Sequence, residues 1–463
     1  MRVKGSKSRC LTARKIKNMS SQPNVLFMIA DDHRWDAISG MGDPTVKTPT
    51  MDSLMARGTT FRQTHIMGSL SGAVCVPSRA AVLTSASLFR SGANQINRDY
   101  AVWPQVMRQA GYHTFFSGKW HNDRQTFADS FDDGGTIFFG GMGNQYKVPI
   151  FDFDPTGKYP QDDRYIGDKF STELFTDSAV QFIENYDQTD PFFLYLSFTS
   201  PHDPRTPPGE YATMYKPEEV PVPENFLPEH PFDNGEMRIR DEVLAEFPRT
   251  PEIVQQHIAD YYGMITSQDA EMGRLLNTLE ANGHLDNTIV IYTADHGLAV
   301  GQHGLLGKQN LYDHSIRVPS IFAGPGIPEG TTVDALTYLY DVFPTVCDLT
   351  SVECPDTTEG CSLVPLMEGC VDQVRPTVFA AYKDIHRTIS DGRWKLIRYY
   401  VSEETGKGTD YIQLFDLEQD PWETTNLADL PEHADRIRSL AADMKMWQTE
   451  TDDFMKDTPI LLQ

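Results

Sequence analysis

The strongest chemical signature in the chain is the segment Cys75-Val76-Pro77-Ser78-Arg79. Proline suits the first turn of a helix, because the N–H groups of that turn have no intrahelical partner. We therefore predict a helix that begins at Cys75, with the thiol near unpaired amides and the positive end of the helix dipole. Arg79 follows about one turn later on the same face. A thiol, an arginine and a helix N-terminus together favour the binding of an anion.

Two interpretations of Cys75 follow from the residues alone: a small buried cysteine in a tight turn, or a nucleophile with a lowered pKa. The longer string, Cys-x-Pro-Ser-Arg followed by Leu83-Thr84, resembles the maturation signature of the type I sulfatases. In that family the cysteine is oxidised to formylglycine, an aldehyde whose hydrate attacks sulfate esters. Ser85 stands where the family usually has glycine.

Two continuous apolar runs end in acidic residues. Residues 24–30 lead into Asp31 and Asp32, and residues 288–294 lead into Asp295, which is followed by His296. Continuous apolar runs of this length are typical of strands buried on both faces of a parallel sheet. Ligands of such sheets gather at the carboxyl ends of the strands, where neighbouring carboxylates repel each other unless a cation lies between them. These ends predict a metal site, with a helix cap and solvated acids as the alternative.

Basic side chains occupy comparable places elsewhere in the chain. In isolation such residues are usually surface or turn residues, so their common placement is what favours a shared cleft. They are Lys119 and His121 after an apolar strand at 113–118, His202 in a proline-rich turn after a strand at 191–197, and Lys308 at the end of a glycine-rich loop at 301–308. That loop lacks the glycine spacing and the Ser or Thr of a Walker P-loop.

The sulfatase resemblance then extends over most of the chain in the family's order. The matching segments are Asn24-Val25-Leu26 into Asp31-Asp32, Gly118-Lys119-Trp120-His121, Ser200-Pro201-His202, Thr293-Ala294-Asp295-His296-Gly297 with Gly307-Lys308, Trp394-Lys395-Leu396, and Leu414-Phe415-Asp416-Leu417 with Asp420-Pro421 and Glu423. At position 296 the family often has asparagine. Each segment alone is weak evidence, and their order together with the cysteine signature makes the resemblance specific.

The resemblance implies a role for each of these side chains. Asp31, Asp32, Asp295, His296 and the formylglycine made from Cys75 would hold one divalent cation, calcium or alternatively magnesium. Arg79 and Lys119 would hold the aldehyde hydrate, and Lys119 and Lys308 would bind sulfate oxygens. His202, with Lys308, would protonate the leaving alcohol, and His121 would remove the proton that releases sulfate and restores the aldehyde.

We expect an α/β fold with a large, mixed, mostly parallel sheet flanked by helices, of the alkaline-phosphatase kind, and a smaller C-terminal antiparallel sheet. A chain of 463 residues exceeds the usual size of a single hydrophobic core. The pattern of short strands after residue 371 therefore suggests three parts. These are a basic flexible tail at 1–22, a catalytic domain at 23–370 and a C-terminal subdomain at 371–463.

The charge balance excludes several partners. With 40 basic and 65 acidic residues the net charge is −25, which opposes nonspecific binding to nucleic acid or to anionic membranes.

No run of 18 apolar residues is present, so we expect no transmembrane helix. The basic segment 1–22 lacks the apolar stretch of a signal peptide. The compartment therefore stays open between a cytoplasmic protein and one whose start codon is assigned too early, with Met19 as the alternative start.

The remaining cysteines do not form a zinc motif. Cys10 lies in the basic tail, and Cys347, Cys354, Cys361 and Cys370 lack the paired C-x-x-C spacing of zinc sites. We expect free thiols in this cluster, with one disulfide as the alternative.

Three functions agree with these motifs. The first is a sulfatase that acts on a small sulfated substrate, by preference a saccharide, and that depends on a formylglycine-generating maturation enzyme. The second is a phosphonate monoester or phosphodiester hydrolase of the same superfamily, and the third is a non-catalytic sulfoglycan-binding protein. Aromatic and arginine residues suit sulfated sugars, so the candidate subsites are Arg34, Trp35, Trp103, Arg205 and the insertion at 123–170.

We expect the substitution Cys75→Ala to abolish the release of sulfate from an aryl sulfate while leaving the fold intact, because it removes the precursor of the nucleophile. Sulfate release and the circular dichroism spectrum would be measured side by side, with Cys354→Ala as the control. Unchanged turnover by Cys75→Ala would contradict the assignment of the nucleophile.

Overall fold

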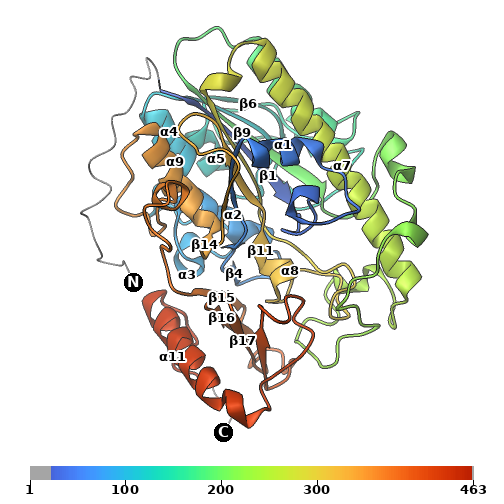
Figure 1. The fold of residues 1–463 in the computed structure, drawn as a ribbon. Coiled ribbons are helices and arrows are strands. Elements are labelled where there is room, and N and C mark those ends of the chain that lie inside the picture. The colour runs from blue at the N-terminus through green and yellow to red at the C-terminus, as the bar shows by residue number, and fades with distance from the viewer. Residues whose placement is uncertain (1–21, 461–463) are drawn as a thin grey trace.

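A large sheet forms the centre of the computed structural model, which describes residues 22–460 (Figure 1). Its strands run parallel, except that β12 is antiparallel to both of its neighbours, β10 and β2. The expected mixed, mostly parallel α/β sheet is therefore confirmed. In spatial order the strands are β13 (Thr331–Val333), β2 (Gly58–Phe61), β12 (Ser320–Ala323), β10 (Thr288–Ala294), β1 (Asn24–Asp31), β9 (Phe192–Pro201), β5 (His113–Lys119) and β6 (Asp133–Phe138).

The central strands β1 and β10 are the two continuous apolar runs, and β9 includes the strand expected at 191–197. Every residue of β1, β9 and β10 is buried, as expected for strands with helices on both faces. In the register, Ala30 of β1 lies beside Ala294 of β10, and Asp31 lies beside Pro201 of β9. The polar residues that follow these strands therefore emerge at one edge of the sheet.

Helices cover both faces of this sheet (Figure 1). On one face α1 and α6 pack against the long helix α7, which begins at a threonine N-cap, Thr250, followed by a proline at the first helical position. On the other face α2 contacts α4 and α9, and α4 contacts α5. Their bounds are α1 (Pro49–Ala56), α6 (Ser171–Glu184), α7 (Pro251–Ala281), α2 (Cys75–Thr84), α4 (Trp103–Gln109), α5 (Arg124–Ser130) and α9 (Val342–Thr350).

This packing places one of the candidate subsite residues in the core. Trp103 is fully buried in α4, with its ring centroid 4.9 Å from that of Phe27 and 5.0 Å from that of Phe193. An indole wedged between two core strands packs the sheet and cannot reach a ligand. The expectation of a substrate subsite at Trp103 is therefore wrong.

A second sheet lies in the C-terminal part of the chain (Figure 1). It is antiparallel except at one edge, where a short strand that precedes Cys75 pairs parallel with its first C-terminal strand. The strand at 386–390 had no clear signal in the sequence. In spatial order the strands are β18 (Tyr411–Asp416), β17 (Trp394–Tyr399), β16 (His386–Ser390), β15 (Val378–Tyr382) and β4 (Gly68–Ser69), and α11 (Ala434–Glu450) packs on β16 and β17.

A buried ion-pair network joins this second sheet to the main body. The ammonium group of Lys395 on β17 lies 2.7 Å from carboxylate oxygens of Asp313 and Glu423. The other carboxylate oxygen of Glu423 accepts the backbone N–H of Asp313 at 2.8 Å. All three side chains are buried, so each charge depends on its partners for stabilisation.

The other α-helices and strands are short. They are α3 (Leu88–Ser91), α8 (Asp313–Ile316) and α10 (Val364–Met367), a sheet of β11 (Arg317–Val318), β3 (Thr64–His65) and β14 (Thr337–Tyr338), and the pair β7 (Pro149–Ile150) and β8 (Tyr165–Ile166).

Among residues 22–460, no helix combines the length and the apolar character needed to cross a bilayer. Cys347 carries a free, buried thiol. Cys10 and nearly all of the basic segment expected to be a flexible tail lie outside the described residues.

Several buried histidines make the stability of this fold dependent on pH. Burial lowers the pKa of His65 and His230 to about 4 and that of His386 to about 3, against about 6.5 in the unfolded chain. Between those values the unfolded state binds protons that the folded state does not. These groups therefore contribute stability above pH 6.5, and it is lost as the pH falls towards 4.

We expect each buried histidine to cost up to about 1.4 kcal/mol of unfolding free energy at pH 5.5 relative to neutral pH. The variant His386→Gln should lose less stability over that interval than the wild type. Urea unfolding at pH 7.5 and pH 5.5 would measure this, with the half-buried His284 changed to Gln as the control. An identical loss in wild type and His386→Gln would show that His386 is not the source.

Candidate active site

Three carboxylates converge at the edge of the large sheet. Asp31 ends β1, Asp32 follows it, and Asp295 follows β10, so parallel strands bring them to one place. The backbone N–H of Asp32 donates to the carboxylate of Asp295 at 3.3 Å. Asp32 has a left-handed backbone with φ of 74°, which is unfavourable for a residue other than glycine. Strain of this kind clusters at functional sites.

Each carboxylate carries a cationic partner from another part of the chain. Lys119 at the end of β5 pairs with Asp31, Arg79 of α2 with Asp295 at 2.8 Å, and Lys308 with Asp32 at 2.7 Å. These side chains are nearly inaccessible to solvent, so each charge is stabilised mainly by its partners.

The pKa values of the acids reflect this balance. Burial raises the pKa of Asp31, and so does Asp295, but Lys119, His202 and Arg79 outweigh both and hold the pKa below its ordinary value. For Asp295, burial is likewise outweighed by His296 and Arg79. The acids therefore stay ionised, as metal ligands must be.

Cys75 lies inside this ring of charges. It begins α2, which confirms the predicted helix, and its side chain is 3% exposed. Its Sγ lies 3.2 Å from Nδ1 of His121. Burial raises the pKa of the thiol, but Lys119, His121 and Lys308 bring it well below its ordinary value. Residue 75 thus lies where an anionic or strongly polarised group is stabilised.

Oxygen, nitrogen and sulfur atoms here fit a metal ion. Ligand atoms of Asp31, Cys75, Asp295 and His296 all lie within 4.8 Å of one another, and those of Asp31, Asp32 and His202 form a second such group. Asp31 Oδ1 and His296 Nε2 are buried without a hydrogen-bond partner. Burying polar atoms that lack a partner costs free energy, and a bound cation would supply that partner. Asp32 joins the second group and not the first.

The two histidines beside Asp32, His202 and His296, lie in different surroundings. Nδ1 of His202 lies 2.8 Å from the backbone carbonyl oxygen of Asp203, and Nε2 lies 3.9 Å from Asp32. The carbonyl can only accept, so Nδ1 carries a proton and Nε2 faces the site. His296 is fully buried, which lowers its pKa, but Asp295 and Asp32 raise the pKa to about 8. As a metal ligand His296 would have to release this proton.

A glycine at the end of β5 is required by close packing. Gly118 has φ of 108°, and a Cβ built on it would lie 1.8 Å from the carbonyl oxygen of Ser197. The register with β6 shifts at this point, between Ser117 and Gly118. This irregularity redirects the chain so that Lys119 and His121 both turn towards Cys75.

The insertion at 123–170 approaches the site along one side. It supplies β6 to the large sheet, a strand that the Gly- and Asp-rich sequence did not reveal. Beyond β6, the amide of Gln145 donates to the carbonyl oxygen of His202 at 3.0 Å. A Cβ on Gly141 would lie 2.6 Å from Nε2 of His121. No sequence motif marks Gln145, because its contact with His202 depends on the path by which the loop returns to the site.

The other candidate subsite residues lie apart from the carboxylates. Arg34 forms an ion pair with Asp36 and lines, with Trp35, a separate pocket of about 390 Å³. The ring of Trp35 lies 3.5 Å from the guanidinium of Arg317. Arg205 is buried next to His257, with two of its nitrogen atoms unpartnered.

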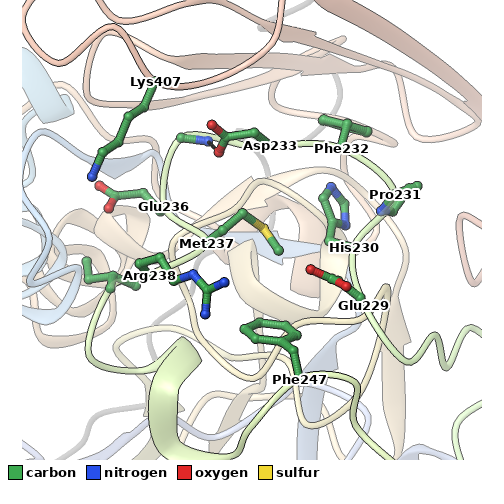
Figure 2. Close-up of a pocket in the computed structure, with 12 residues that line it drawn as sticks. Glu229, His230, Pro231, Phe232, Asp233, Glu236, Met237, Arg238, Phe247 and Lys407 are labelled. Atoms are coloured by element: carbon green, nitrogen blue, oxygen red, sulfur yellow. Dashed lines mark hydrogen bonds between the residues drawn. The ribbon is translucent and has the colours of Figure 1, made fainter.

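A larger polar pocket of about 780 Å³ is formed by residues 229–233 and 235–239 together with Phe247 and Lys407 (Figure 2). Acidic and basic side chains alternate around it, among them Glu229, Glu236 and Lys407. Its lining residue Ile239 lies 3.2 Å from the position of a Cβ on Gly72, in the loop that leads to Cys75. The pocket therefore borders the loops around the site without including its charged residues.

A mixed α/β sheet with a carboxylate cluster at its strand ends that could hold a metal ion is the arrangement expected of the alkaline-phosphatase superfamily. The sulfatase family model matches residues 23–352, and the model described as N-sulphoglucosamine sulphohydrolase, C-terminal, matches residues 301–450. The chain belongs to the sulfatase family. It is a sulfuric ester hydrolase.

Relatives with known names agree with this assignment. The chain is 28% identical over 500 residues to an N-acetylglucosamine-6-O-sulfatase of Bacteroides thetaiotaomicron, with 92% of this chain and 86% of that protein covered. A solved complex of a protein with its substrate D-glucosamine-2-N,6-O-disulfate is similar, with a TM-score of 0.79, 26% identity and coverage of 95% and 100%. The phosphonate monoester hydrolase of Agrobacterium radiobacter has a TM-score of 0.74 at 21% identity, covering 93% and 96%, which shows the shared fold.

We expect calcium to raise the thermal stability of the protein, because a cation offsets the repulsion among the buried carboxylates. A ligand at 1,000 times its dissociation constant adds about 4 kcal/mol, which corresponds to a few degrees in melting temperature. Melting would be followed in EDTA, in calcium and in magnesium, for wild type, Asp31→Asn and the exposed control Asp435→Asn. A shift retained in Asp31→Asn would place the metal elsewhere.

Proposed function

We propose that this enzyme removes sulfate from a sulfated carbohydrate, with a formylglycine made from Cys75 as the nucleophile precursor and calcium as the metal. The observation that carries the proposal is the position of residue 75, which lies among Lys119, His121 and Lys308 and beside the cluster of Asp31, Asp295 and His296. The formylglycine hydrate would supply an activated hydroxyl for attack on sulfur. The metal would be held by Asp31, Asp32, Asp295 and His296 and would neutralise charge on the sulfuryl group.

The side chains of the protein have separate tasks in this proposal. Lys119 and Lys308 bind sulfate oxygens, since both ammonium groups lie close enough to lower the pKa of residue 75. Arg79 presents an unpartnered, buried Nη2, which we assign to residue 75 in its modified form. His121 holds or accepts a proton at Nδ1, 3.2 Å from residue 75. His202, as an imidazolium with a proton on each ring nitrogen, donates the Nε2 proton to the leaving oxygen and becomes neutral.

The carbohydrate assignment rests on the relatives and on the surroundings of the site. The named relative acts on N-acetylglucosamine 6-O-sulfate, and the similar solved structure holds a glucosamine disulfate. The pocket of Figure 2 combines carboxylates, cations and the aromatic rings of Phe232 and Phe247. Such side chains suit the hydroxyl groups and the apolar faces of sugar rings.

A phosphonate monoester hydrolase is the second candidate, because such enzymes share this fold. The two reactions would be compared as kcat/KM for 4-nitrophenyl sulfate and for a phenyl phosphonate monoester. A panel of sulfated saccharides would then identify the sugar and the position of the sulfate. We expect the sulfate ester to be preferred by at least about tenfold, which is 1.4 kcal/mol in transition-state binding.

The formylglycine is tested directly by mass spectrometry of the tryptic peptide that spans residues 63–79. We expect an aldehyde in place of the Cys75 thiol in active protein, and a loss of activity in parallel when the chain is produced without the maturation enzyme. An unmodified thiol in fully active protein would refute the formylglycine mechanism.

A further inference from the structure

We propose that three consecutive residues, Arg240, Asp241 and Glu242, are positioning residues that hold His202 and Lys308 in register with each other. The inference rests on the proposed function of the site, which gives those two side chains their roles. The segment lies in the irregular, proline-rich stretch between β9 and α7. Asp241 and Glu242 are nevertheless buried, at 6% and 3% exposed, so their charges need specific partners.

Glu242 fixes the glycine-rich loop that carries Lys308. Its two carboxylate oxygens accept the backbone N–H groups of Leu306 at 2.9 Å and of Gly307 at 2.8 Å. Arg249 donates to the same carboxylate at 2.8 Å and to the carbonyl oxygen of Gly304 at 2.5 Å. The second half of the loop, from Gly304 to Gly307, is therefore fixed by one buried ion pair.

The approach is close enough to require glycine at position 307. A Cβ there would lie 2.6 Å from Oε1 of Gln309, 2.9 Å from Cβ of Asp241 and 2.9 Å from Oε1 of Glu242. The residue before Lys308 is thus packed directly against the segment. Any movement of Asp241 or Glu242 would be transmitted to the Lys308 backbone.

Asp241 holds the other side of Lys308. Its carboxylate accepts the amide N–H of Gln309 at 2.7 Å, and the amide oxygen of Gln309 accepts the backbone N–H of Lys308 at 3.1 Å. The Gln309 amide also donates to the carbonyl oxygen of Gly72 at 3.0 Å, in the loop before Cys75. The residues on either side of Lys308 are therefore held by consecutive acidic residues, Gly307 by Glu242 and the side chain of Gln309 by Asp241.

Arg240 reaches in the opposite direction, to His202. Its guanidinium donates to both oxygens of Asp203, at 2.6 and 2.8 Å, and to Asp241 at 2.5 Å. Asp203 in turn lies 3.3 Å from Nδ1 of His202 and accepts from it through its backbone carbonyl. The bidentate pair sets the orientation of Asp203, and through it that of the imidazole. One short segment thus connects the leaving-group side of the site with the sulfate side.

The test compares full-length, matured Arg240→Gln and Glu242→Gln with the wild type on phenyl sulfate and 4-nitrophenyl sulfate. These substrates are similar in size, but phenol is the weaker acid and depends more on a proton donor. We expect Arg240→Gln to lower kcat/KM about fivefold more on phenyl sulfate than on 4-nitrophenyl sulfate. Arg240→Lys, which keeps the charge and loses the fork, should fall between.

Glu242→Gln should lower kcat/KM on both esters by the same factor, about tenfold or more, because an amide cannot accept two N–H groups with both of its terminal atoms. The exposed Glu246 on the same segment supplies the matched control, and Glu246→Gln should stay within about twofold of the wild type on both esters. An equal loss on both esters in Arg240→Gln, or near wild-type activity in Glu242→Gln, would overturn the proposal.

Hydrogen exchange separates this inference from the proposed function. Peptides over residues 301–310 should exchange faster in Glu242→Gln than in the wild type and in Glu246→Gln. Unchanged exchange there would overturn the positioning role even if the enzyme is a sulfatase. If exchange is faster in Glu242→Gln but the wild type hydrolyses neither aryl ester nor any sulfated saccharide of the panel, the positioning role is supported and the proposed function is rejected.

Discussion

The mutual repulsion of Asp31, Asp32 and Asp295 is the constraint on which this structure depends. Parallel strands bring these carboxylates together at one edge of the sheet, where burial removes the solvent that would screen them. Lys119, Arg79 and Lys308 each neutralise one of them. The fold therefore needs cations from three separate segments before the sheet edge is stable, and that requirement assembles the site.

Much of the fold could be predicted because hydrophobic burial leaves a clear pattern. The strands β1, β9 and β10 are continuous apolar runs, and the helix α2 begins at its predicted residue, Cys75. The pattern failed where burial is partial. The edge strand β6 begins with Asp133-Gly134-Gly135, which lacks an apolar pattern, and Trp103 is a candidate subsite only because its chemical type suits sugars.

The candidate site was predictable to the extent that it lies at strand ends. Asp31, Asp295 and Lys119 follow apolar strands, and the order of those strands brings their ends together. The supporting contacts were not predictable, since Gln145, Asp241 and Glu242 lie in irregular chain whose path depends on tertiary packing. Acidic residues in a proline-rich loop have the composition of a solvated surface, and only the structure shows that two of them are buried.

The pairing of β4 with β15 has a consequence for the order in which the chain is made. Gly68 pairs with Ala381, so the segment just before Cys75 has no strand partner until the C-terminal sheet has been synthesised. Contacts this distant in sequence form late, because a long loop must close first. Cys75 is 3% exposed in the finished fold. The thiol of Cys75 is therefore most accessible in the interval between its emergence from the ribosome and the completion of this sheet.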